Sequence, residues 1–159
     1  MKIIVFSDSH GDLSLMKSAI EAVGPDRAIH LGDYVRDAAE LQRLYPNIPF
    51  DIVKGNNDFV TAYPQSKVLE IGGKTLYLSH GDRYAVKFGI ERIAWKGKEL
   101  GVDAVLFGHT HVPYLDRDGG MWIMNPGCIG HQTYLSKSPT YGLIEISGDI
   151  TFEIVSIAR

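Results

Sequence analysis

Two histidines separated by a single residue, His109 and His111, are the residues of this chain best suited to chemistry. They follow the apolar run 102–107, within the stretch Gly108-His109-Thr110-His111. A short apolar run of this kind is typical of a buried strand, and side chains two positions apart on an extended chain point the same way. Both imidazoles can therefore reach one small volume, and imidazole is the commonest protein ligand for a metal ion.

Polar residues also follow four other apolar runs. These are Asp8-Ser9-His10 after 2–7, Gly32-Asp33 after 28–31, Gly55-Asn56 after 51–54, and His80-Gly81 after 75–79. Any one of them has an ordinary explanation, because a lone histidine is often hydrogen-bonded in the core and Asp beside Gly often makes a turn. Seven such residues at five successive strand ends are hard to obtain from turns alone, so we expect them to converge on one metal site.

The elements that must position these residues alternate in type over the first half of the chain. Apolar runs predict strands at 2–7, 28–31 and 49–54, and amphipathic spacing predicts helices at 12–23, with Asp12 as its cap, and at 35–45, ended by Pro46. A strand-helix-strand-helix-strand order predicts a parallel sheet.

The second half is richer in strands. Strands at 67–71 and 74–79 flank a Gly72-Gly73 hairpin, and a helix at 89–100 is closed by Gly101. Further strands are predicted at 102–107, 113–116, 121–125, 141–146 and 150–157. We predict two mixed β-sheets packed as a sandwich flanked by helices, in one domain spanning 1–159.

Composition narrows the function classes. The 159 residues include 16 basic and 19 acidic ones, a net charge of −3, and the basic segment 87–98 has the spacing of a solvated helix face. This is no strong signature of nucleic-acid binding, which needs clustered positive charge.

The apolar run 3–6 is too short for a signal peptide, and no run reaches the roughly 18 residues of a membrane span. With a single cysteine, Cys128, no internal disulfide can form. We expect a cytoplasmic protein with no membrane association.

The motifs, taken in order, resemble those of the calcineurin-like metallophosphoesterases, in particular the small bacterial and archaeal phosphodiesterases. They are Asp8-Ser-His10, Gly32-Asp33, Gly55-Asn56-Asn57-Asp58, Ser79-His80-Gly81, Gly108-His109-Thr-His111 and Asn125-Pro126-Gly127. The resemblance runs nearly end to end. It implies a four-layer fold, helix-sheet-sheet-helix, in agreement with the elements predicted above.

The resemblance also implies two metal ions. Asp8, His10, Asp33 and His111 would bind one, and Asp33, Asn56, His80 and His109 the other, with Asp33 as the bridge. Ligands of this mixture suit Mn first, with Ni, Zn or Fe as alternatives. The implied reaction is hydrolysis of a small phosphoester by direct attack of metal-bound hydroxide, in which Asp33, Asn56 and His109 act through the metals and substrate positioning.

Three departures from the family pattern concern the substrate rather than the metals. Many relatives carry His where this chain has Asn57, and an amide cannot supply a proton to the leaving group. Many small relatives read His-Gly-His where this chain has Asp82 third, and Asn-Pro-Gly-Ser where it has Cys128. The leaving-group acid, for which Asp58 and His131 are candidates, is therefore open.

Other residues receive plainer interpretations. We expect His30 to be a core or supporting residue, and Trp95 and Trp122 to serve in packing. His131 could face the substrate pocket, but we expect it to lie in a surface loop. Arg83 could contact phosphate or only begin a helix, and Tyr34 could line the site or only pack.

We keep alternatives to the phosphodiesterase. One is a protein-interaction scaffold of the same fold, as in a subunit of eukaryotic retromer, and another is a phosphomonoesterase. A nuclease for polymeric DNA is a weaker third interpretation, and a homo-oligomer is left open.

Overall fold

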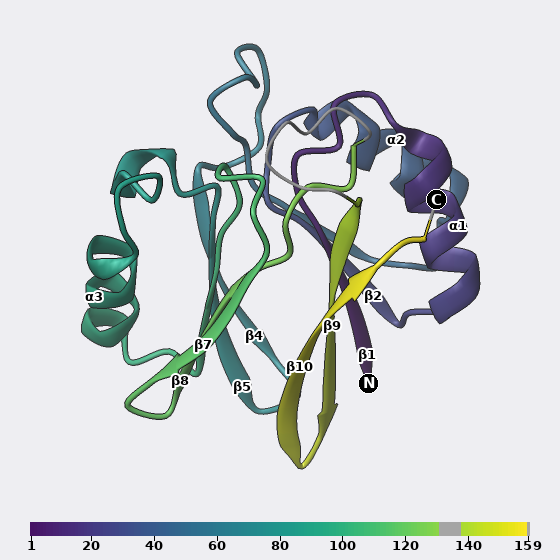
Figure 1. Ribbon diagram of the computed structural model, residues 1–159. Helices are drawn as coiled ribbons and strands as arrows, with labels where there is room; N and C mark the ends of the chain where they lie inside the picture. Colours follow the sequence, from purple (N-terminus) through teal and green to yellow (C-terminus); the bar gives the residue numbers. More distant parts are fainter. Residues whose placement is uncertain (131–137, 159) are drawn as a thin grey trace.

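Four layers make up the molecule (Figure 1). The computed structural model describes residues 1–130 and 138–158. Within them two five-stranded sheets pack face to face, with α1 (Leu13–Val23) and α2 (Val35–Leu44) on one outer face and α3 (Glu91–Leu100) on the other. This is the sandwich that the sequence predicts, and the fold class is confirmed.

The first sheet has the order β10-β9-β1-β2-β3. Its parallel part comprises β1 (Lys2–Phe6), β2 (Arg27–His30) and β3 (Phe50–Ile52), joined through α1 and α2. The antiparallel hairpin of β9 (Thr140–Ser147) and β10 (Asp149–Ser156) extends it beside β1.

The second sheet has the order β4-β5-β6-β8-β7. The hairpin of β4 (Ser66–Ile71) and β5 (Lys74–Ser79) turns at Gly72-Gly73 as predicted. A short 3₁₀ helix, η1 (Asp82–Tyr84), and α3 connect β5 to the parallel strand β6 (Ala104–Leu106). The sheet is completed by β8 (Met121–Asn125), parallel to β6, and β7 (Tyr114–Asp118), antiparallel to β8.

Burial on both faces explains why the central strands read as unbroken apolar runs. In β1, Ile3 and Val5 pack between the sheets, while Ile4 and Phe6 pack under α1 and α2. Each such fully buried side chain contributes about 1.5–3 kcal/mol relative to exposure. The core therefore fixes both faces of the strands whose ends carry the candidate ligands.

The structure differs from the prediction at element ends and at one tryptophan. Strands β3 and β6 are shorter than the apolar runs 49–54 and 102–107, because the residues beyond them turn into loops. Trp122 packs against the core between the sheets, as expected. Trp95 was predicted to pack but is 72% exposed on α3, whose inward face is formed by Ile93, Ala94 and Gly97. Among the described residues, no helix is long and apolar enough to cross a membrane.

Candidate metal centre

The carboxyl ends of the parallel strands meet at one end of the sandwich. Strand β1 runs upward from the amino terminus in Figure 1, and the loops that follow β1, β2, β5 and β6 gather at its upper end. One ligand atom each from four residues lies within 4.8 Å of the other three; the residues are Asp8, His10, Asp33 and His111. They are the same four residues that the family resemblance assigns to one ion.

The spacing of nitrogen atoms in this cluster suits ligation. His10 Nε2 lies 3.3 Å from His111 Nε2, and His111 Nε2 lies 3.1 Å from Asp8 Oδ1. Two nitrogens bound at about 2.1 Å to one ion, in tetrahedral or octahedral arrangement, would lie about 3.0–3.4 Å apart. A pair of imidazole lone pairs at this separation can therefore share one cation.

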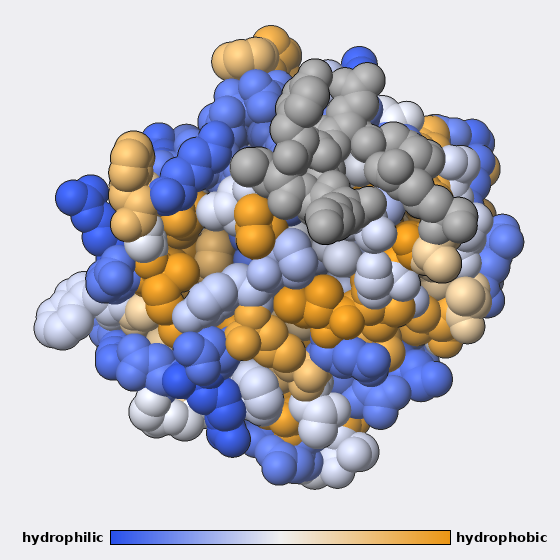
Figure 2. Space-filling model, in the orientation of Figure 1, coloured by the Kyte–Doolittle hydropathy of each residue, from blue (hydrophilic) through white to orange (hydrophobic). Residues whose placement is uncertain are grey.

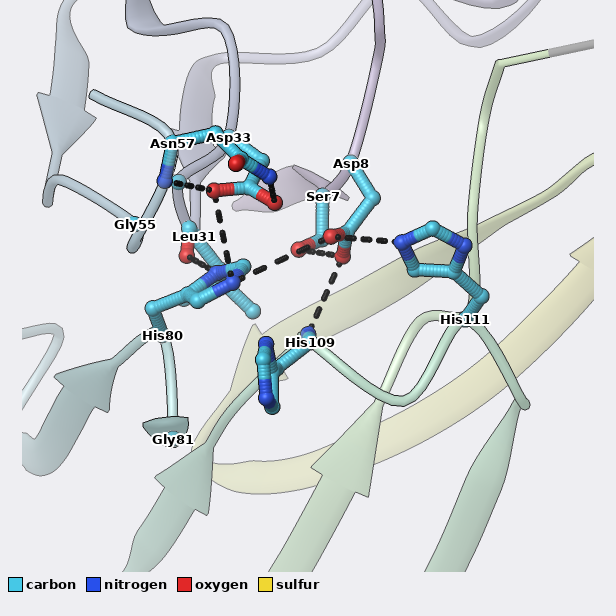
Figure 3. A network of polar contacts seen from close by, with 12 residues as sticks. Ser7, Asp8, Leu31, Asp33, Gly55, Asn57, His80, Gly81, His109 and His111 are labelled. Carbon is cyan, nitrogen blue, oxygen red and sulfur yellow. Dashed lines mark hydrogen bonds and ion pairs between the residues drawn. The ribbon is translucent and has the colours of Figure 1, made fainter. Parts of the chain in front are cut away.

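His80 comes from the other sheet and faces the same volume (Figure 3). Its Nδ1 lies 2.8 Å from the carbonyl oxygen of Leu31; a proton donated there leaves Nε2 as a lone pair. That Nε2 lies 3.5 Å from Asp33 Oδ1 and 3.9 Å from Asp8 Oδ1. The ring of His109 stands edge-on to that of His80, with centroids 5.0 Å apart.

Two buried atoms of the centre lack a hydrogen bond from any described residue. They are Asp8 Oδ1 and His80 Nε2, on side chains that are fully buried. An unsatisfied buried polar atom costs about 1–3 kcal/mol, so the arrangement calls for a cation that both atoms can bind. The residues present therefore fit the divalent metal ions of the family.

Asn56 is the candidate ligand with the least contact to the others. It is exposed on the loop after β3, and no hydrogen bond joins its side chain to another candidate ligand within the described ranges. It lines a cavity of about 320 Å³ together with Lys54, Asp82 and Arg83. Arg83, in η1, thus shares a cavity with Asn56.

Electrostatics keeps the carboxylate at the centre ionised. Burial alone would raise the pKa of Asp8, but contact with the His111 imidazole and the charges of His80 and His111 hold the pKa below its ordinary value. Contact with Asp8 conversely raises the pKa of His111, whereas burial lowers that of His109. An anionic Asp8 among imidazoles is the charge state that a cation would bind.

The backbone is strained at the candidate ligands. Asp8, His10, Asp33, His109 and His111 all have positive φ, between 48° and 68°. Residues other than glycine visit this region at a cost of roughly 1–2 kcal/mol each, and such residues cluster at functional sites. Strain at five loop positions indicates that the loops are shaped for the placement of side chains.

Glycine is required where two of these loops touch. A Cβ at Gly55 would collide with the Asp33 carboxylate, and a Cβ at Gly108 would collide with Ser7 Oγ. The glycines of the two motifs thus let neighbouring loops approach the carboxylates closely.

Asp58 has a structural role that the sequence did not reveal. Its carboxylate accepts backbone N–H bonds from Asp33, Tyr34, Val35 and Gly55, at 2.8–3.0 Å. It therefore caps α2, whose N-cap residue Tyr34 makes no side-chain cap. An acceptor of four amide protons is poorly suited to donate one to a leaving group.

A second buried network supports the β1 loop. His30 Nδ1 accepts from the Gly32 amide, His30 Nε2 lies 3.1 Å from Ser9 Oγ, and Ser9 Oγ donates to Asp37 at 2.7 Å. Burial lowers the pKa of His30 to about 4, so the ring is neutral. His30 is a supporting core residue, as expected; Ser9 and Asp37 were missed, since nothing local in the sequence links positions 28 residues apart.

The remaining motif residues hold loops in place. Asn125 Nδ2 donates to the carbonyl of Gly108 and to Thr110 Oγ1, which fixes the loop that carries both histidines. Asn57 donates from its amide N and its Nδ2 to the two oxygens of Asp33. Cys128 is buried and its thiol donates to the Asp8 carbonyl; burial raises its pKa to about 12, so it is not a reactive thiolate. His131 lies outside the described residues.

Comparisons with known proteins identify the family of the chain. Residues 1–149 match the family model of the calcineurin-like phosphoesterase superfamily domain. The chain is 29% identical to the probable metallophosphoesterase YsnB of Bacillus subtilis over 153 residues, covering 94% of this chain and 86% of that one. It is 27% identical to a phosphodiesterase of Methanocaldococcus jannaschii over 175 residues, covering 98% and 99%.

Solved structures show the same fold. A predicted phosphoesterase from Streptococcus pneumoniae superposes with a TM-score of 0.81 at 28% identity, covering 98% of this chain and 88% of that one. Vps29 from Entamoeba histolytica gives 0.78 at 21% identity, covering 99% and 100%, a likeness of fold alone. On the match to the family model, the chain belongs to the calcineurin-like phosphoesterase superfamily.

Proposed function

We propose that the protein is a two-metal phosphoesterase that favours phosphodiesters. The observation that carries this proposal is the cluster of two buried carboxylates, Asp8 and Asp33, with two half-buried histidines, His10 and His111. The fully buried His80 directs an unpartnered Nε2 toward it. A bound cation would satisfy both unpartnered atoms, and a metal site of this kind is what a phosphoesterase needs to hold a phosphoryl group.

We assign the ligands as the family resemblance implies. Asp8, His10, Asp33 and His111 hold one ion, and Asp33, Asn56, His80 and His109 the other. Imidazole, carboxylate and amide donors without a thiolate favour Mn, with Ni, Zn or Fe as alternatives. The exposed loop position of Asn56 makes it the ligand most dependent on the bound ion for its orientation.

When bound, two such ions lower the pKa of a water molecule and neutralise charge on the phosphoryl oxygens. The chain's own residues hold and orient the ligand set. The two donors of Asn57 fix the Asp33 carboxylate, the Leu31 carbonyl fixes the tautomer of His80, and Asn125 fixes the loop of His109 and His111. Asp33, Asn56 and His109 thereby act in catalysis by positioning rather than as nucleophiles.

Two features support a diester over a monoester. A relative similar along nearly its whole length is a phosphodiesterase. At position 57, where many phosphatase relatives have a histidine, this chain has an amide whose Nδ2 is engaged with Asp33. Hydrolysis of phosphomonoesters is the alternative activity of the same site.

A non-catalytic scaffold is the second candidate function, because Vps29 structures share the fold. A direct assay separates the two. Metal-stripped protein is reloaded with Mn, Ni, Zn, Fe or Mg and given a panel of nucleotide, glycerol and aryl phosphoesters, with Asp33→Ala as the control. We expect metal-dependent hydrolysis, fastest with diesters, that Asp33→Ala abolishes. Absence of turnover with every metal and ester would leave the scaffold as the better interpretation. Cytoplasmic location and homo-oligomerisation remain predictions.

A further inference from the structure

A cavity of about 470 Å³ lies directly beside the candidate metal centre. Its lining comes from the start of α2 and from the loop joining β3 to β4, hereafter the β3–β4 loop (residues 53–65). His10 and Asn57 line the cavity, and both also belong to the centre, the first as a candidate ligand and the second as the hydrogen-bond donor to Asp33. A group attached to a phosphorus atom at the centre can therefore extend into this space.

The remaining walls combine apolar and aromatic side chains with the polar residues Arg36, Asp58 and Thr61. Tyr34, Phe59 and Val60 line the cavity, and the last two are 84% and 100% exposed. Figure 2 shows apolar side chains standing at the top of the molecule, where the β3–β4 loop lies in Figure 1. Apolar side chains left in water at the rim of a site gain free energy when a ligand covers them.

Planar groups dominate the inner wall. The Tyr34 ring lies 5.0 Å from the His10 ring, and the Arg36 guanidinium lies 4.7 Å from the centroid of Tyr34. Arg36 lines the cavity with its guanidinium over the Tyr34 ring, so a planar cation and an aromatic ring stand together at this wall. Guanidinium and aromatic faces attract flat rings more strongly than they attract short alkyl chains.

We propose that this cavity is a subsite for an aromatic ester group of the substrate, with Phe59, Val60 and Tyr34 as specificity-determining residues. The proposal rests on the proposed function, since it places the ring on a phosphoester held at the metal centre. The volume falls within the range of ordinary ligand pockets and exceeds what a methyl ester would fill.

The first test compares each substrate with itself across variants, so that intrinsic leaving-group reactivity cancels. Phe59→Ser/Val60→Ser is assayed with an aryl diester and an alkyl diester, and Phe88→Ser is the control. Phe88 is likewise exposed, at 94%, but does not line the cavity. Loss of aromatic contact worth about 0.5–1.5 kcal/mol predicts a kcat/KM for the aryl ester that falls about twofold to tenfold more than for the alkyl ester. Phe88→Ser should change neither.

The second test measures binding without turnover. Isothermal titration of metal-loaded protein with phenylphosphonate and methylphosphonate should show about tenfold tighter binding of the phenyl compound. The double variant should lose this preference and Phe88→Ser should keep it. Equal affinities in the wild type, binding of neither compound, or a preference that survives in the double variant would overturn the subsite. Failure of the proposed function is distinct, because it would appear as absence of turnover with all esters even if the phenyl preference held.

Discussion

Side chains at the centre have two roles, as candidate metal ligands or as hydrogen-bond donors that hold those ligands in place. Some face the shared volume, and others, such as Asn57 and Asn125, use their amide groups to fix a carboxylate or a loop. Asn57 shows why a motif position must be interpreted by its contacts. Where many relatives carry a histidine, its side-chain Nδ2 donates to Asp33 Oδ2, beside the backbone N–H that donates to Oδ1. The centre gains rigidity there and lacks a proton donor.

Asp33 is expected to be the most damaging ligand to lose. Asp33→Ala should lose both of the two metal equivalents, because the Asp33 carboxylate belongs to both proposed ligand sets. His10→Ala should mainly remove one. Elemental analysis after dialysis against metal measures this, with unfolding curves to show that both variants are folded. Equal, mild losses in the two variants would contradict the bridging assignment.

Asn57 predicts a steep dependence of turnover on the leaving group. A good general acid contributes about 10²–10⁴-fold, most of all when the departing alkoxide is poor. Without one, aryl diesters should react far faster than alkyl diesters in a series of graded leaving-group pKa, at saturating metal with chemistry rate-limiting. Asn57→His should flatten the series if metal content is unchanged. A flat series in the wild type would mean that another group delivers the proton.

His30→Gln should leave metal stoichiometry intact, since the hydrogen bonds of the ring to described residues go to Ser9 and the Gly32 amide. We expect a loss of about 1 kcal/mol in the free energy of unfolding, measured in urea, because one of the two buried hydrogen bonds is weakened. Loss of one metal equivalent would show instead that His30 is a ligand.

At the scale of elements, the site depends on how loops are tied to helix ends. Asp58, from the β3–β4 loop, caps α2 and also holds the amides of Asp33 and Gly55, so one carboxylate joins the loops after β2 and β3. The two loops that carry Asp33 and Asn56 therefore keep their separation through a residue that is not a candidate ligand.

Asp58→Ala should destabilise the protein by about 2–3 kcal/mol, because a helix cap and further buried amide bonds are lost together. Asp58→Asn retains one acceptor oxygen and should cost about half as much. Glu40→Ala, on the same helix but in an exposed pair with Arg43, should cost much less than either Asp58 variant, because exposed ion pairs contribute little to stability. Urea unfolding compares the three. Equal losses for Asp58→Ala and Glu40→Ala would refute the capping role.

The sequence predicted what local pattern determines. Apolar runs located the strands, and the caps Asp12 and Gly101 located the ends of α1 and α3. Polar residues at successive strand ends indicated a shared site, and the family resemblance supplied the grouping of Asp8, His10, Asp33 and His111. Contacts between distant positions could not: Ser9 with Asp37, and Asp58 with α2, have no local signal. The prediction that Trp95 packs was wrong for a related reason, since the residue type alone does not say which side of a helix faces the sheet.

At the scale of the whole molecule, the centre is divided between the two sheets. Asp8 and Asp33 follow strands of the first sheet, whereas His80, His109 and His111 follow strands of the second. Any sliding of one sheet over the other would separate carboxylates from imidazoles. The apolar layer between the sheets resists separation but has little directional preference. Directional contacts between the sheets therefore matter to the site.

One such contact is the buried carboxylate of Asp51 on β3, which pairs with Arg27 on β2 and with Lys67 on β4 of the other sheet. Burial alone would raise the pKa of Asp51, but hydrogen bonds to Arg27 and Lys67 hold it below the ordinary 3.8. The folded state thus favours the ionised form. The resulting stabilisation is fully present above the unfolded pKa and is lost as pH falls through the lower, folded pKa.

Asp51→Asn should therefore lower the free energy of unfolding by about 1–3 kcal/mol at pH 7, because a charged acceptor of two hydrogen bonds is replaced by a neutral one. The difference between wild type and variant should stay constant down to about pH 5 and shrink below about pH 4, where the wild-type carboxylate also becomes protonated. Urea unfolding at pH 7, 5 and 3.5 measures it, with Glu40→Gln as an exposed control whose difference stays small throughout. If the difference in unfolding free energy between wild type and Asp51→Asn is unchanged at pH 3.5, packing rather than charge joins the sheets at this edge. Lower metal affinity in Asp51→Asn at pH 7, measured by calorimetry, would further indicate that the alignment of the sheets is transmitted to the ligands.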